Sequence, residues 1–91
     1  MQTDEPIHVL IRRLRTETGL TERQLADKLA LISGHSGITA NRVRRWETGE
    51  RIPGPKWRHY LSLALGAPST GLASAAKLTR LLRSLDESEP R

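Results

Sequence analysis

The sequence predicts an all-α protein, a compact bundle of about five short helices. Apolar residues recur at spacings of three and four along five segments, and helix start and stop signals separate these segments. No segment shows the alternation of apolar and polar residues that is typical of a β-strand. The chain of 91 residues has no Phe. We therefore expect one small domain with a modest core built from aliphatic side chains.

The first helix is expected to start near Asp4, with Pro6 tolerated in its first turn. Its apolar residues follow the i, i+3, i+4, i+7 rule for a buried helix face. These residues are Ile7, Leu10, Ile11 and Leu14. Gly19 is expected to end this helix.

The second helix has the clearest start signal in the chain. Thr21 and Gln24 have the spacing of a capping box, and Leu20 with Leu25 has the spacing of a hydrophobic staple. The helix is expected to run to about Ile32. The run SGHSG that follows has the composition of a loop.

The third helix is expected over Ala40–Thr48. Thr39 is a suitable N-cap residue, and Gly49 is expected to follow the helix end in a left-handed conformation. Val43 and Trp46 stand three apart and share one face. The rest of the circumference is polar, with one asparagine and three arginines: Asn41, Arg42, Arg44 and Arg45. Such a helix is suited to presentation at the surface, and these residue types bind guanine, adenine and phosphate.

Two further helices complete the bundle. Pro55 is expected to open the fourth at its first position, and Gly66 is expected to end it. Ser69 or Thr70 is expected to cap the fifth, which runs to about Leu85. Its apolar positions form a leucine stripe, made of Leu72, Ala75, Leu78, Leu82 and Leu85.

The charge of the chain is unevenly distributed. The net charge is +5, but residues 12–58 contain eleven Lys and Arg against five Asp and Glu. The remaining acidic residues lie towards the two ends. A basic middle indicates a polyanionic partner such as a nucleic acid, although a solvated basic surface with no such partner has the same composition.

The order of short capped helices resembles the phage-repressor and Cro-type helix-turn-helix family, also called the XRE family. The resemblance covers about residues 7–66 and rests on LTERQLA in the second helix and GITANRVRRWETGERIPGP in the third helix and its exit. It implies a lambda-repressor-like helix-turn-helix fold. It also implies a transcriptional regulator, expected to be a repressor, that binds double-stranded DNA sequence-specifically with its third helix in the major groove.

The resemblance also implies roles for individual residues. The base-contacting positions would be Ala40, Asn41, Arg44 and Arg45. The DNA backbone-contacting positions would be Thr39, Arg42, Arg51, Lys56 and Arg58. Trp46 would pack in the core, and Arg15 would form an ion pair with Glu47.

The chain departs from the family pattern in two places. The second helix usually begins with a glutamine that contacts phosphate, but here that position is Glu22, and Arg23 is expected to make the backbone contact in its place. The turn between the second and third helices is longer than usual, with about seven extra residues in the range 30–36. Thr39 as N-cap, and Ile38 with Val43 at the spacing of a hydrophobic staple, indicate that the third helix itself is retained.

From this resemblance we expect a helix-turn-helix DNA-binding domain at residues 1–68, followed by a C-terminal helix with a polar tail at residues 69–91. We expect a homodimer formed through the leucine stripe, with Leu72, Leu78, Leu82 and Leu85 as contacts. The other interpretation is that this helix completes the monomer core. The alternative function is a protein-interaction module, such as an antitoxin, that uses the same stripe.

Other classes of chemistry are not indicated. The chain has no Cys, and its three His have no carboxylate at ligand spacing, so we expect no metal site, no cofactor and no enzyme activity. No apolar run approaches the length of about 18 residues that a membrane helix needs. Few aromatic residues are present for base stacking, which makes RNA a less favoured partner than duplex DNA. We expect a cytoplasmic, nucleoid-associated protein with no implied small-molecule ligand.

Overall fold

The computed structural model describes residues 5–88, and every regular element within that range is a helix. The helices are α1 (Ile7–Thr18), α2 (Glu22–Ser33), α3 (Ala40–Glu47), α4 (Pro55–Leu65) and α5 (Ser69–Ser88). The prediction of a five-helix all-α bundle is confirmed. None of the described helices is both long and apolar enough to cross a membrane.

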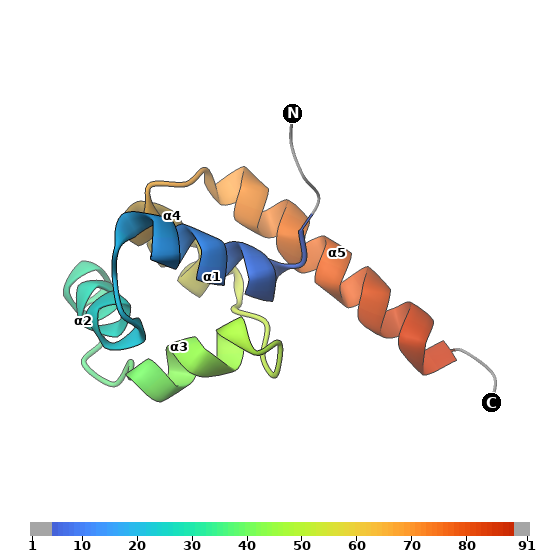
Figure 1. Cartoon of the computed structure of the whole chain (residues 1–91), viewed down its shortest axis with the longest axis horizontal. Helices are drawn as coiled ribbons and strands as arrows, with labels where there is room; N and C mark the ends of the chain where they lie inside the picture. The colour runs from blue at the N-terminus through green and yellow to red at the C-terminus, as the bar shows by residue number, and fades with distance from the viewer. Residues whose placement is uncertain (1–4, 89–91) are drawn as a thin grey trace.

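Helix α1 lies at the centre of the bundle and packs against α3, α4 and α5 (Figure 1). Helix α2 packs against α3 and α4, and α5 packs against α1 and α4. The C-terminal half of α5 extends beyond the other four helices (Figure 1). Helix α3 therefore lies on one side of the molecule, held by α1 and α2, and Arg83 of α5 donates a hydrogen bond to the carbonyl of Gly49 just beyond its end.

All five helices contribute to one core. Its largest fully buried helical side chains are Ile7, Ile11, Leu25, Leu29, Val43, Leu61 and Leu72. Burying a side chain of this size stabilises the fold by about 1.5–3 kcal/mol relative to exposure. Trp46 is also buried, as predicted, so α3 is anchored by Val43 and Trp46 together.

The capping signals of the sequence set most helix ends. The predicted capping box of α2 is present: Gln24 N donates to Thr21 Oγ1 at 3.0 Å, and Thr21 N donates to Gln24 Oε1 at 2.8 Å. Helix α2 continues to Ser33, one residue beyond the predicted end, and stops where Gly34 adopts a φ of +76°. Pro55 is the first residue of α4, as predicted.

The start of α1 was predicted wrongly. The helix begins at Ile7 and not near Asp4, which lies outside the described residues, and Pro6 precedes it in an extended conformation with ψ of 153°. The N–H of Ile7 donates to Thr79 Oγ1 of α5 at 2.9 Å. A contact with α5, rather than a local cap, therefore satisfies the first N–H of α1.

The start of α5 and the role of its first leucine also differ from prediction. Ser69 is the first helical residue and not a cap. Leu72 has no exposed surface and Ala75 is buried, so Leu72 is a core residue and the prediction that it forms a dimer contact is wrong. Leu78 is half-buried, whereas Leu82 and Leu85 are exposed. The leucine stripe therefore completes the monomer core in its first half and reaches solvent in its second.

Candidate nucleic-acid interface

Helix α3 has the predicted capped and anchored form. Thr39 precedes it in an extended conformation, and its Oγ1 accepts a hydrogen bond from Arg42 N at 3.3 Å. The helix ends at Glu47, and Gly49 follows with a φ of +83°. Val43 and Trp46 fill the inner face of α3. Its other polar residues therefore face outward, namely Asn41, Arg42, Arg44 and Arg45.

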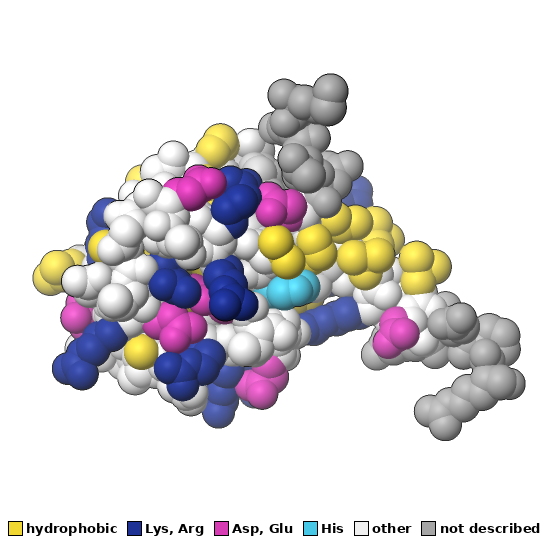
Figure 2. All heavy atoms as spheres, viewed as in Figure 1, with side chains coloured by type: hydrophobic (Ala, Val, Ile, Leu, Met, Phe, Trp, Pro, Cys, Tyr) yellow, Lys and Arg dark blue, Asp and Glu magenta, His cyan; other side chains and the backbone are white. Residues whose placement is uncertain are grey.

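The outward face brings five predicted contact residues together. Asn41, Arg42 and Arg45 are exposed on α3, and Ala40 is half-exposed at its start. A hollow of about 450 Å³ lies where α3 meets the exit loop at residues 48–54, and Arg51 N of that loop donates to the carbonyl of Arg45. Its lining includes Thr39, Asn41, Arg42, Arg45 and Arg51. Three guanidinium groups around one hollow make a strongly cationic surface, and Lys and Arg side chains lie along this edge of the molecule (Figure 2).

Stacking on a tryptophan orients Arg42. Its guanidinium carbon lies 5.0 Å from the ring centroid of Trp57 and 5.9 Å from that of Trp46. Cation–π contacts of this kind are worth about 0.5–1 kcal/mol at exposed sites. The centroid of the His35 ring, in the turn between α2 and α3, lies 5.9 Å from that of Trp57. The turn therefore closes against α4 beside Arg42.

Two of the predicted base-contacting arginines are paired with carboxylates. Arg44 Nε lies 3.2 Å from Glu22 Oε1 of α2, and Arg45 Nε lies 3.2 Å from Glu50 Oε2 of the exit loop. Sequence reasoning missed both pairs, although it singled out Glu22 as unusual. Both members of the Arg45–Glu50 pair are well exposed, and such pairs contribute little to stability, so a polyanion can replace Glu50 at modest cost.

Arg58 does not join the other predicted phosphate contacts. Its Nη1 donates to the carbonyl of Pro53 at 2.9 Å, and the side chain is half-buried. Burial, together with the nearby charge of Arg80, lowers the pKa of Arg58 from its ordinary value. Arg58 thus braces the exit loop, because the turn at Pro53 brings a backbone carbonyl within its reach. Lys56 and Arg23 are exposed, and Lys56 lines one hollow together with Arg42.

A buried ion pair fixes the end of α3 to α1. Arg15 Nε lies 2.5 Å from Glu47 Oε2, and Arg15 Nη2 lies 2.9 Å from Glu47 Oε1. Only 16% of the Arg15 side chain and 4% of the Glu47 side chain are exposed. The hydrogen bond to Glu47 is the main reason that the pKa of Arg15 is raised. The predicted pair is present, and it makes Glu47 a structural residue.

Arg15 also connects this pair to the start of α2. Its Nη1 donates to the carbonyl of Leu20 at 2.9 Å, in the loop that enters α2. One guanidinium therefore ties together α1, the α1–α2 loop and the end of α3. The orientation of the α3 face depends on this junction.

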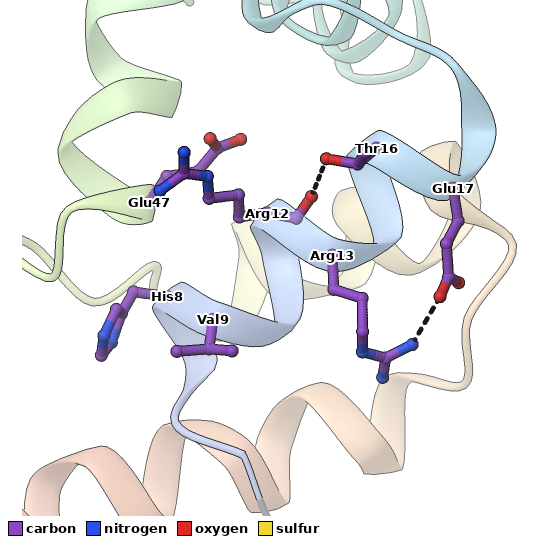
Figure 3. Close-up of a pocket in the computed structure, with 7 residues that line it drawn as sticks. All are labelled: His8, Val9, Arg12, Arg13, Thr16, Glu17 and Glu47. Carbon is purple, nitrogen blue, oxygen red and sulfur yellow. Dashed lines mark hydrogen bonds and ion pairs between the residues drawn. The ribbon is translucent and has the colours of Figure 1, made fainter.

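A second hollow, of about 430 Å³, was not predicted. It lies on the outer face of α1 between α3 and α5, with Arg12 extending towards Glu47 (Figure 3). His8 lines it, and His8 Nδ1 is buried without a hydrogen-bond partner among the described residues. No group of three potential metal-binding residues occurs in the described part of the chain.

No protein-family model, curated protein or solved structure matches the chain. The function of the α3 face is therefore inferred from its own residues. They offer arginine and asparagine side chains on an anchored short helix, beside a cationic hollow. This arrangement is suited to a groove lined by phosphates.

Proposed function

We propose that this chain is a sequence-specific, double-stranded DNA-binding transcriptional regulator that inserts α3 into the major groove as a homodimer. The observation that carries the proposal is the convergence of Asn41, Arg42, Arg45 and Arg51 on one hollow beside an anchored α3. The size and polarity of an exposed helix of this kind suit the major groove. A DNA partner places the protein in the cytoplasm, at the nucleoid.

The proposed contacts fall into two groups. Asn41 and Arg45, with Ala40 and Arg44, face the base edges, because arginine suits guanine O6 and N7 and asparagine suits adenine N6 and N7. The second group binds the sugar–phosphate backbone and fixes the register of α3. It consists of Thr39, Arg42, Arg51, Lys56 and Arg23. Repression is the proposed mode, because a small chain that covers a promoter blocks it without any further activity.

The homodimer is proposed to form through the exposed end of α5. A single recognition helix reads only a few base pairs, and helix-turn-helix proteins overcome this by binding two half-sites as dimers. Leu81, Leu82 and Leu85 are large exposed hydrophobic residues of α5. Hydrophobic side chains gather along α5 beside the start of α1 (Figure 2). A symmetric contact between two such surfaces would bury them.

The same surface supports the alternative function. An antitoxin-like protein would use Leu81, Leu82 and Leu85 to bind a different protein rather than a second copy. RNA is less favoured, because Trp57 is half-buried and stacks with Arg42 and His35. That ring is therefore not presented as a platform for bases.

Two neighbouring arginines provide a matched test of the proposal. Arg45→Ala should relax base preference at one position of each half-site, at a cost of about 1–3 kcal/mol in discrimination. Arg51→Ala should weaken binding to every duplex alike, and should flatten the slope of log K against log salt by about 0.9 for each phosphate that the variant no longer neutralises. Binding is measured with duplexes that the wild-type protein selects from a random library.

The two variants are each other's control, since both remove one guanidinium from the same hollow. Equal weakening of all sequences by Arg45→Ala would make Arg45 a phosphate contact. An unchanged salt slope for Arg51→Ala would place the DNA on another face of the molecule.

A further inference from the structure

The pair between Glu22 and Arg44 places a carboxylate at the edge of the proposed DNA-reading face. Glu22 is the first residue of α2, and its Oε1 accepts from Arg44 Nε at 3.2 Å, across 22 positions of sequence. A guanidinium has five N–H donors in a planar fork, and this bond uses the one on Nε. The terminal Nη1 and Nη2 groups can still form the two parallel bonds that recognise guanine.

Three features hold the Glu22 carboxylate in place. It lies in the first turn of α2, where the helix dipole stabilises a negative charge. The positive charge of Arg15 lies close enough that Glu22 contributes to the raised pKa of Arg15. Only 22% of the Glu22 side chain is exposed, against 62% for Arg44. The carboxylate is therefore the fixed member of the pair, and the arginine is the member that it positions.

The pair between Arg45 and Glu50 differs in this respect. Glu50 lies in the exit loop outside any helix, and 62% of its side chain is exposed. Its carboxylate can leave Arg45 without disturbing a helix. Glu50 therefore serves as an internal comparison for Glu22, since each carboxylate contacts one arginine of α3 at 3.2 Å.

We propose that Glu22 is a specificity-determining residue that positions Arg44, holding its Nε so that Nη1 and Nη2 point at a guanine in the major groove. This inference rests on the proposed function. Pre-ordering a long side chain lowers the entropy that its contact with a base would otherwise cost. The contact is also directional, because Nε is already bonded to Glu22 and only Nη1 and Nη2 remain to contact the base.

The same carboxylate raises discrimination against other DNA. A negative charge at the groove edge repels phosphates, so it weakens binding to every duplex. Only a site with guanine in front of Arg44 offsets that repulsion with two hydrogen bonds. Specificity is the difference between the affinity for the selected site and the affinity for other DNA. Glu22 widens this difference, because it favours the contact with guanine and weakens binding to duplexes that lack it.

The experiment uses the full chain and the duplex that the wild-type protein enriches from a random library. Each guanine of that duplex is replaced in turn by 7-deazaguanine, which lacks the N7 acceptor. Replacement of the guanine that Arg44 contacts should weaken wild-type binding by about tenfold. That guanine is identified as the position where the same replacement no longer changes the affinity of Arg44→Ala. Glu22→Ala should be insensitive at the same guanine and should bind duplexes lacking it more tightly.

Two further variants complete the design. Glu22→Gln keeps an oxygen that accepts from Arg44 Nε, so it should retain sensitivity at that guanine. Glu50→Ala should also retain it, although binding to all duplexes should tighten. Circular dichroism of each variant checks that the helix content of the chain is unchanged.

Full sensitivity of Glu22→Ala at that guanine would overturn the inference and leave Glu22 as a general repulsive charge. Loss of sensitivity in Glu50→Ala as well would also overturn it, because any nearby carboxylate would then have the same effect. A wild-type protein that enriches no duplex would instead refute the proposed function, and this inference with it.

Discussion

Arg15→Ala is expected to destabilise the protein by about 3–5 kcal/mol, because it strands the Glu47 carboxylate without its partner. Only 4% of the Glu47 side chain is exposed, so its charge is poorly solvated once the guanidinium of Arg15 is removed. The same substitution removes the bond from Arg15 to the carbonyl of Leu20. Urea denaturation followed by circular dichroism measures the change in the free energy of unfolding.

Arg13→Ala is the matched control, from the same helix and residue type. Arg13 pairs with Glu5 and Glu17 at the surface, where 44% of its side chain is exposed, so little change in stability is expected. Replacing Arg15 and Glu47 together with methionine and leucine should recover much of the loss, because neither charge is then left buried. A stability of Arg15→Ala equal to that of Arg13→Ala would show that the pair does not hold α3 in place.

Leu82→Glu is expected to give a folded monomer that binds its selected duplex at least about 100-fold more weakly, the scale on which two linked binding modules exceed one. Leu82 is exposed on the part of α5 that extends beyond the bundle, so the substitution leaves the core intact. A new carboxylate would be buried at a symmetric contact and would face its own copy. Sedimentation equilibrium, with and without DNA, measures the assembly.

Leu63→Glu is the control for this substitution. Leu63 is a large exposed hydrophobic residue of α4, outside the α5 surface, and the same change there should alter neither assembly nor binding. A wild-type protein that sediments as a monomer both free and on its selected duplex would contradict the homodimer. The exposed end of α5 would then be available to a different protein.

Local signals in the sequence predicted most helix ends correctly. The capping box at Thr21, the cap at Thr39 and the proline at Pro55 act within one turn of the chain, so they can be read without knowing the fold. The start of α1 was predicted wrongly because it depends on a contact with a residue that is distant in the sequence. Its first N–H bonds to Thr79, which lies 72 positions away in the sequence.

In the candidate interface, too, features set by local sequence could be predicted and contacts between distant residues could not. The outward placement of Asn41, Arg42 and Arg45 follows from helical spacing around Val43 and Trp46. Their partners do not follow from it. The Glu22–Arg44 pair depends on how α2 packs against α3, and the role of Arg58 depends on the path of the exit loop.

Helical spacing also could not assign the leucine stripe to the core or to an interface. Leu72 and Leu82 occupy the same periodic pattern, yet one is covered by the bundle and the other lies beyond it. The difference comes from the length of α5 relative to α1 and α4, which end before it does (Figure 1). Only the three-dimensional arrangement contains that information.

The central claim, that the α3 face binds duplex DNA, is tested most directly by NMR. Amide resonances of the ¹⁵N-labelled chain are followed during titration with its selected duplex, and with a single-stranded RNA for comparison. The duplex should shift amides of α3, the exit loop at residues 48–54 and the first turn of α2, and the RNA should leave them nearly unchanged. Duplex-dependent shifts confined to α1 and α5, with α3 unaffected, would contradict the claim.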